Sequence, residues 1–552
     1  MISKFLNTQT KSVTFASIIL GFFYICSASL GLLRDRLLAG TFGAQNELDV
    51  YYAAFTIPDF IALILVFGAI SAAIIPIFSQ YLVNSKEEAW RYTNALLNVF
   101  LGGLIIVSIF FIIFAPFFVK LIAPGFTPEK QAMTASLMRI MFLSPILLGL
   151  SNIVSGILQV FHRFLVTALA PLMYNIGIII GILVLVPRFG FVGLAWGVVL
   201  GGVLHLLIQL PAFFYSGFRV QGLGFRLQNF KHPGVIKTLI MMVPRSLGLG
   251  AGQFNTMITT SIASTLAVGS VAVFNLAGNL SSLCVNAIAI SLSTAIFPSM
   301  SLAHLQNDKH VFNQKFSHAL RQILFLLVPI SFLIFLLRAQ IVRVILGTGR
   351  FGWTDTRLTA ACLGLFAVGL CGQGLVFLLS KTFYALHNTK IPAIISAFTV
   401  ACNIGLSLLL VWLLGFSAGF SQFVSMALRL EDIENITVVA LPMAFAATML
   451  LEALLLLVFL YKQYGTFSVR YEVLAFGKML LAGAVLVVAT FVIRNFMVQY
   501  ELIHLQTFLE VFLQLCLSAA AGLAAYVATS FLLKSQELQR IIASFSRGKI
   551  VH

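Results

Sequence analysis

Apolar runs long enough to cross a lipid bilayer recur along the whole chain of 552 residues. A helix of about 20 residues spans the hydrocarbon core of a bilayer. Because 60% of the residues are hydrophobic and only 9% are charged, the composition excludes an ordinary soluble globular domain. The sequence therefore predicts an all-α, polytopic membrane protein.

The apolar runs predict about fourteen transmembrane helices joined by short polar connections. Several runs are longer than a bilayer requires, so we expect tilted or kinked helices. The longest connections, 215–234 and 414–437, are too short for a soluble catalytic domain. The predicted spans are 13–33, 50–82, 92–118, 131–158, 164–186, 190–214, 235–264, 269–300, 317–346, 356–384, 391–413, 438–461, 474–495 and 508–533.

The distribution of Lys and Arg predicts the orientation. With the N-terminus in the cytoplasm, the inner segments hold roughly twice as many Lys and Arg residues as the outer loops. Both termini are therefore expected in the cytoplasm. The net charge of +17 lies mainly in these short loops, so it does not indicate a nucleic-acid partner.

A short internal repeat predicts two similar lobes. SAAIIPIFS, residues 71–79, is echoed by STAIFPSMS, residues 293–301. The offset corresponds to six spans, and an even number of spans between copies gives a parallel repeat. Two six-helix lobes around a central cavity form a transporter architecture. We expect an N-terminal lobe in 1–215, a C-terminal lobe in 235–462, and two further helices with a cytoplasmic tail in 463–552.

Motifs for enzymatic chemistry are missing from the sequence. It contains no GxxxxGK, HExxH or GxSxG stretch, and its six cysteines form no CxxC pair. We therefore expect no enzyme, no cofactor and no metal site. Transport would be driven by the substrate gradient, by a coupling cation or by the membrane potential.

Charged residues inside predicted spans are costly and are candidates for substrate binding. Arg34 and Asp35 end the first span, as an interfacial cap or as part of a cavity. Asp49 and Asp59 lie at the start of the second span and within it. Because Asp59 follows a proline, we expect a broken helix that faces protein or water. Arg139 is the cation for an anionic head group or the partner of a carboxylate.

Uncharged polar residues gather in the seventh and eighth spans. They either form hydrogen bonds between helices or line a polar cavity wall. The cavity interpretation adds three residues to the candidate substrate site: Ser264, Asn275 and Asn279.

The stretch from Leu30 to Leu82, with several later motifs, resembles the MurJ (MviN) family of lipid II flippases. This family lies within the multidrug/oligosaccharidyl-lipid/polysaccharide exporter superfamily. The matching residues are Leu30-Gly31, Arg34-Asp35, Phe42-Gly43, Asp49, Phe55, Ile57-Pro58-Asp59, Gly68-Ala69, Pro76, Ala123-Pro124-Gly125-Phe126, Ala170-Pro171 and Asn175.

The resemblance implies a function in peptidoglycan biosynthesis at the bacterial cytoplasmic membrane. It implies outward export of undecaprenyl-diphosphate-linked disaccharide-pentapeptide and a lipid groove beside the last two helices. Several arginines typical of the family are replaced here; Ala28, Ala62 and Leu63 are examples. Arg34 and Arg139 would then be the anion partners, and Asp49 and Asp59 would gate the cavity or bind a cation or a sugar amide.

Three other functions fit the sequence. The first two are flippase activity on another polyprenyl-diphosphate-linked oligosaccharide and ion-coupled drug export within the same superfamily. The third, a membrane-embedded glycosyltransferase, would need an outer-loop carboxylate near a phosphate or metal site. The loop around Glu47 and Asp49 is small for that role.

Overall fold

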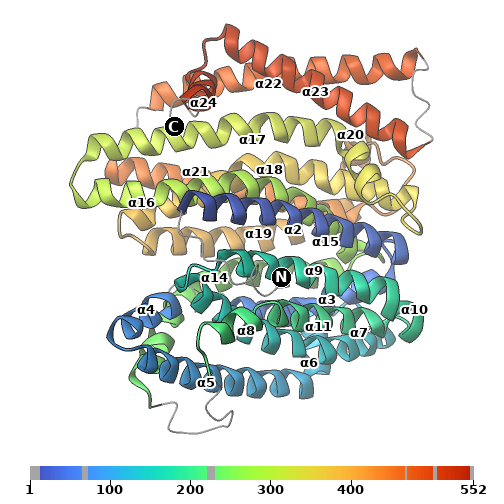
Figure 1. The fold of residues 1–552 in the computed structure, drawn as a ribbon. Coiled ribbons are helices and arrows are strands. Elements are labelled where there is room, and N and C mark those ends of the chain that lie inside the picture. The colour runs from blue at the N-terminus through green and yellow to red at the C-terminus, as the bar shows by residue number, and fades with distance from the viewer. Residues whose placement is uncertain (1–12, 65–72, 220–230, 466–468, 501–506, 548–552) are drawn as a thin grey trace. The chain divides into compact units, whose positions relative to one another are not determined.

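The computed structural model describes residues 13–64, 73–219, 231–465, 469–500 and 507–547 (Figure 1). Every regular element in these residues is a helix. Eleven of the described helices are long and apolar enough to cross a membrane, and shorter apolar helices occupy Pro233–Met242 and Ala418–Leu428. Each of the fourteen predicted spans overlaps at least one helix. The prediction of an all-α polytopic membrane protein is confirmed. The matched residues Gly68 and Ala69 lie outside the described residues.

The chain divides into two compact units, Met1–Ala272 and Val273–His552. The lobe boundaries expected from the repeat stay a prediction. The helices of unit 1 are α2 (Val13–Phe42), α3 (Asn46–Ala62), α4 (Ile75–Asn84), α5 (Lys86–Ile113), α6 (Ala115–Ile122), α7 (Pro128–Met141), α8 (Leu143–Val160), α9 (Phe164–Ile180), η3 (Gly181–Leu185), α10 (Val186–Phe189), α11 (Val192–Leu207), α12 (Leu210–Tyr215) and α14 (Pro233–Ser264).

Local sequence sets where the helices of unit 1 begin. The side chain of Ser85 accepts hydrogen bonds from the N–H groups of Glu87 and Glu88 at the start of α5. Thr127 accepts from the N–H of Lys130 at the start of α7. Both are N-cap contacts that satisfy donors which the first turn of a helix leaves free.

The second predicted span differs from the expectation at its proline. Pro58 lies inside α3, and the helix continues beyond it to Ala62. A proline removes one backbone hydrogen bond from the helix interior. Here the proline alone does not end the helix.

Glycines bring α9 and α11 into close contact within unit 1. A Cβ atom added to Gly177 would lie 2.3 Å from the Cα of Gly201, and one added to Gly181 would lie 2.4 Å from the Cα of Gly197. Small residues spaced four apart allow two membrane helices to approach this closely. α9 also packs against α2, so this contact supports the helix that carries Arg34.

Unit 2 contains the longest helices. α17 packs against α18 and α22, α18 against α21, and α22 against α23. The helix α15 (Ser270–Val285) begins at the end of unit 1 and crosses the boundary. It is followed by η4 (Asn286–Ile290), α16 (Ser291–Leu305), α17 (Lys309–Ile345), α18 (Trp353–Ala385), α19 (Lys390–Phe416), α20 (Ala418–Leu428), η5 (Thr437–Val439), α21 (Ala440–Tyr464), α22 (Val469–Gln499), α23 (Phe508–Leu532) and α24 (Gln536–Arg547).

Two short helices were not expected. α20 lies in the predicted connection 414–437, and α24 follows the last span. In Figure 1, α20 lies at one end of the long helices of unit 2 and runs across them. With 11 residues, α20 is too short to span a bilayer, so the apolar-length criterion does not detect it.

Candidate functional site

An ion pair lies within unit 1 on α2. Nε and Nη2 of Arg34 donate to one carboxylate oxygen of Asp35, at 3.0 and 2.8 Å. Nη1 of Arg34 donates to Oδ1 of Asn175 on α9 at 3.2 Å. The Asp35 side chain is buried, whereas that of Arg34 is 24% exposed. A guanidinium has five N–H donors, so Arg34 is held in place with donors left over.

Tyrosines and a second carboxylate surround this pair. Tyr51 lies within electrostatic range of Arg34, Asp35 and Asp59. Asp59 accepts a hydrogen bond from Nε2 of Gln253 on α14 at 3.1 Å. The side chain of Asp59 is exposed although it lies within a predicted span. Charges in the interior of membrane proteins commonly face a water-filled space. Arg34, Asp35 and Asp59 therefore belong to one polar region of unit 1.

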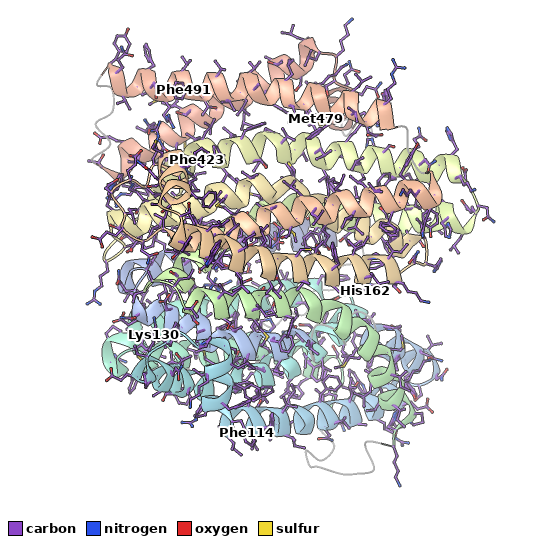
Figure 2. The ribbon with its side chains drawn as sticks, turned by 180° about the vertical axis from the view of Figure 1, so that it is seen from behind. Phe114, Lys130, His162, Phe423, Met479 and Phe491 are labelled. Atoms are coloured by element: carbon purple, nitrogen blue, oxygen red, sulfur yellow. The ribbon has the colours of Figure 1, made fainter. Side chains whose placement is uncertain are left out.

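The carboxylate of Asp49 is buried, and both of its oxygens accept hydrogen bonds. Oδ2 of Asp49 accepts from Nζ of Lys130 and from the N–H of Gly269, both at 2.8 Å. Oδ1 accepts from the N–H of Ala272 at 2.9 Å. The carboxylate thus joins the start of α3 to the start of α7 (Figure 2, Lys130) and to the turn before α15. Charge-assisted hydrogen bonds of this kind are the strong ones.

Backbone segments meet closely around this carboxylate. The N–H of Gly125 donates to Oγ of Ser264 at 3.3 Å. A Cβ atom at Gly125 would lie 2.4 Å from the carbonyl oxygen of Ser264, and one at Gly269 would lie 2.0 Å from that of Ala44. Gly269 also has a φ of +86°, which glycine adopts without strain. Only glycine fits these two positions, so the ends of α3, α7 and α14 form one tight cluster.

The remaining predicted site residues lie elsewhere. Arg139 is exposed near the end of α7, and its Nε donates to the carbonyl oxygen of Ile112 on α5 at 3.2 Å. Asn275 and Asn279 are half-buried on α15 in unit 2. Unit 1 therefore brings Arg34, Asp35 and Asp59 together, with Asp49 and Ser264 in a second cluster, and leaves Arg139 outside both.

The sequence did not single out Lys130, the partner of Asp49. A signal was present, because both residues lie at the same end of their predicted spans: the second span begins beside Asp49 and the fourth beside Lys130. Tyr51 could have been found in the same way, since it lies two residues after Asp49 and about two helical turns before Asp59. Asn175 appears in the sequence analysis only among the residues that match the family. Among the described residues, no group of three or more His, Cys, Asp or Glu side chains is placed to hold a metal ion.

Comparisons with known proteins identify relatives of this chain. The family model described as "Lipid II flippase MurJ" matches residues 38–421. The lipid II flippase MurJ of Burkholderia cenocepacia is 30% identical to this chain over 376 residues, which cover 67% of this chain and 73% of the relative.

Solved structures share the fold. A structure titled "Lipid II flippase MurJ, inward closed conformation" has a TM-score of 0.73 at 24% identity, and the match covers 94% of this chain and 98% of that one. An inward-facing multidrug resistance MATE family transporter of the MOP superfamily has a TM-score of 0.64 at 15% identity, covering 79% and 94%. At these identities the two structures support the fold alone.

Proposed function

The chain belongs to the MurJ family of lipid II flippases, and from this membership we propose that it exports lipid II across the bacterial cytoplasmic membrane by alternating access. Members of this family are transporters and not enzymes. The substrate would be the undecaprenyl-diphosphate-linked disaccharide-pentapeptide. The observation that supports a head-group site in this chain is Arg34, which is partly exposed, fixed by Asp35 and Asn175, and left with unused donors.

A diphosphate must leave water before it enters a cavity within the membrane. The cost of removing its charges from water is offset only by cations or by several hydrogen-bond donors. Arg34 would supply such donors, because its planar guanidinium binds two phosphate oxygens at once. Asp35 would compete with the phosphate for Arg34 and thereby allow release.

The other candidate residues would have supporting roles. Asp59 would meet a coupling cation or a sugar amide, since it accepts its hydrogen bond from the neutral Gln253. Asp49 and Ser264 would hold one end of unit 1 closed. Asn275 and Asn279 would form a polar wall for the head group. Arg139 would meet the phosphate only in a conformation that differs from this one.

We also propose lobes in 1–215 and 235–462 that move against each other, with the helices of 463–552 beside them. Both termini would be cytoplasmic. Single cysteines in place of Gln45 and Gly349 should react with a membrane-impermeant reagent from outside intact cells. Cysteines near either terminus should react only after the cells are opened. Termini on opposite sides of the membrane would contradict the proposed topology.

One observation favours a second candidate. The cationic set typical of the family is thinned, with Ala28, Ala62 and Leu63 at positions where arginine is usual. A flippase for another polyprenyl-diphosphate-linked oligosaccharide would share the fold and Arg34 but not the sugar contacts.

Complementation tests the proposal directly. The chain should restore growth to a bacterium depleted of its own lipid II flippase, and the Arg34→Ala variant should not. The variant Arg91→Ala is a matched control, because Arg91 forms an exposed ion pair with Glu87. If the chain is present in the membrane but growth is not restored, another lipid-linked glycan becomes the better candidate.

A further inference from the structure

Three arginines gather at one end of unit 2. Arg338 lies on α17, Arg429 directly follows α20, and Arg494 lies on α22. Nη2 of Arg338 donates to the carbonyl oxygen of Leu428 at 3.4 Å, which places it next to Arg429. Nη1 of Arg494 donates to the carbonyl oxygen of Leu336, two residues from Arg338, at 3.3 Å. The three side chains therefore lie at the same level of the helices.

None of these three arginines has a carboxylate partner among the described residues. The ion pairs within 4.0 Å involve other basic residues: Arg34, Arg91, Lys130, Arg321 and Arg357. Arg338 and Arg494 instead donate to backbone carbonyls, and the charge of Arg429 repels both. Like charges gathered next to an apolar phase are costly unless an anion joins them.

A glycine on α18 provides space for the side chain of Arg338. A Cβ atom added to Gly364 on α18 would lie 2.7 Å from Cδ of Arg338, so this glycine accommodates the side chain. Nη1 of Arg338 also donates to the carbonyl oxygen of Phe335 at 2.8 Å. The guanidinium is thus fixed in position, and some of its five donors stay available.

Exposed aromatic rings lie beside two of the arginines. The guanidinium of Arg338 lies 5.0 Å from the ring centre of Phe335, and that of Arg494 lies 5.3 Å from that of Phe491. The two residues are 36% and 46% exposed. Each cation therefore adjoins an accessible apolar surface, as a lipid with an anionic head and apolar chains requires.

The short helix α20 places this cluster at a membrane surface. Its Val424 and Leu428 are buried, whereas Phe423 and Met426 on the opposite face are 69% and 54% exposed. These side chains continue an exposed apolar stripe on α19: Leu408, Leu409, Trp412 and Phe416. Figure 2 shows Phe423 and Phe491 at the same end of unit 2. The exposed apolar surface of α19 therefore continues onto α20, which ends beside the arginines, as expected for a helix that lies at a membrane surface.

We propose that Arg338, Arg429 and Arg494 bind the phosphate of an anionic membrane phospholipid. Its acyl chains would pack on Phe335 and Phe491, and α20 would lie in the head-group layer. In the proposed orientation this is the outer leaflet. The site uses none of the residues proposed to bind the transported head group.

Native mass spectrometry of the purified full-length protein tests the site. Phosphatidylglycerol and phosphatidylcholine are titrated separately, and the affinity of the first bound lipid is measured. The double variant Arg338→Gln/Arg494→Gln should weaken phosphatidylglycerol binding by at least about tenfold, because charge-assisted hydrogen bonds are lost. Binding of phosphatidylcholine, whose head group carries no net charge, should change less.

The double variant could fail to fold, so a single substitution of an exposed residue is tested beside it. Arg429→Gln alters an exposed side chain and should weaken phosphatidylglycerol binding severalfold without lowering the thermal midpoint. Arg350→Gln, at an exposed position in the loop before α18, is the matched control and should have no effect. Unchanged phosphatidylglycerol binding in both cluster variants would overturn the proposal, as would an equal loss in the control.

Inorganic phosphate distinguishes a lipid from a free anion. It lacks acyl chains, so an excess should displace little phosphatidylglycerol. Complete displacement would show a site for free phosphate and would overturn the assignment to a lipid.

Discussion

The two units place their charges differently. Unit 1 holds two ion pairs at buried or partly buried positions, Arg34 with Asp35 and Lys130 with Asp49. In unit 2 the partly buried Arg321 pairs with Glu472 near the start of α22 and with Glu537 near the start of α24. Deeper in unit 2, the buried carboxylate of Glu452 accepts a hydrogen bond from the neutral hydroxyl of Thr399. Buried charges are retained at a cost in desolvation. We propose that the Arg34–Asp35 and Lys130–Asp49 pairs of unit 1 serve substrate binding or gating, whereas the charges and polar contacts of unit 2 named here hold helices together.

Two asparagines in similar short sequences, one in each unit, also differ in what they contact. Asn175 and Asn403 are each followed by Ile-Gly in the sequence. Asn175 accepts a hydrogen bond from the charged Arg34, whereas Asn403 donates to the neutral hydroxyl of Thr448 on α21 at 3.0 Å. The same short sequence thus accompanies a contact with a charge in one unit and a contact between helices in the other.

The largest expected effect is on stability, from Asp49→Ala. The variant leaves Lys130 buried without its partner and removes two hydrogen bonds to backbone N–H groups. Breaking a buried ion pair on one side costs about 3–5 kcal/mol. The thermal midpoint of the purified protein in detergent should fall sharply. The double variant Asp49→Ala/Lys130→Met should recover only part of the loss, because Gly269 and Ala272 still lack their acceptor. A single variant as stable as the parent would remove Asp49 from this role.

The second effect concerns Asp35→Asn. Without the negative charge beside it, Arg34 should hold a diphosphate more tightly and release it more slowly. We expect a lower apparent KM and a severalfold lower turnover in a flipping assay. Glu87→Gln, which alters an exposed ion pair with Arg91, should change neither quantity. An unchanged KM in Asp35→Asn would argue against competition between Asp35 and the substrate.

A smaller effect is expected from Arg139→Ala. Arg139 is exposed and donates to a backbone carbonyl, so its removal should alter the unfolding free energy by no more than about 0.5 kcal/mol. Flipping per folded molecule should decrease less than in a variant of Arg34. An equally large decrease would mean that Arg139 meets the substrate in another conformation.

The smallest effect is expected from Glu452→Gln. The amide oxygen of glutamine can still accept from Thr399, so the cost should stay within about 1 kcal/mol. Flipping should be unchanged. A strong loss of flipping with normal stability would show a functional charge inside unit 2 and would break the comparison between the units.

The fold was largely predictable because membrane helices are encoded by the length of apolar runs. α20 was missed because it is too short for that criterion. The α9–α11 contact could have been found, since Gly193, Gly197 and Gly201 follow a spacing of four on one helix face.

The candidate site was predictable only in part. The free-energy cost of a charged side chain at membrane depth predicted Arg34, Asp35 and Asp59 as site residues. The structure brings these three side chains into one polar region. It did not identify the partners of Asp49, because two of them are backbone N–H groups of Gly269 and Ala272. A backbone donor leaves no side-chain signal in the sequence, and its position depends on how residues 269–272 fold against the start of α3.

Flipping of lipid II in reconstituted vesicles tests the central claim most directly. The rate is normalised to folded protein and compared among the parent, Arg34→Ala, Arg34→Lys and vesicles without protein. We predict that the parent flips lipid II, that Arg34→Ala falls close to the protein-free rate, and that Arg34→Lys restores only part of the activity, because lysine offers a point charge instead of a planar pair of donors. A normalised rate in Arg34→Ala equal to that of the parent would contradict the assignment of Arg34 as the diphosphate partner.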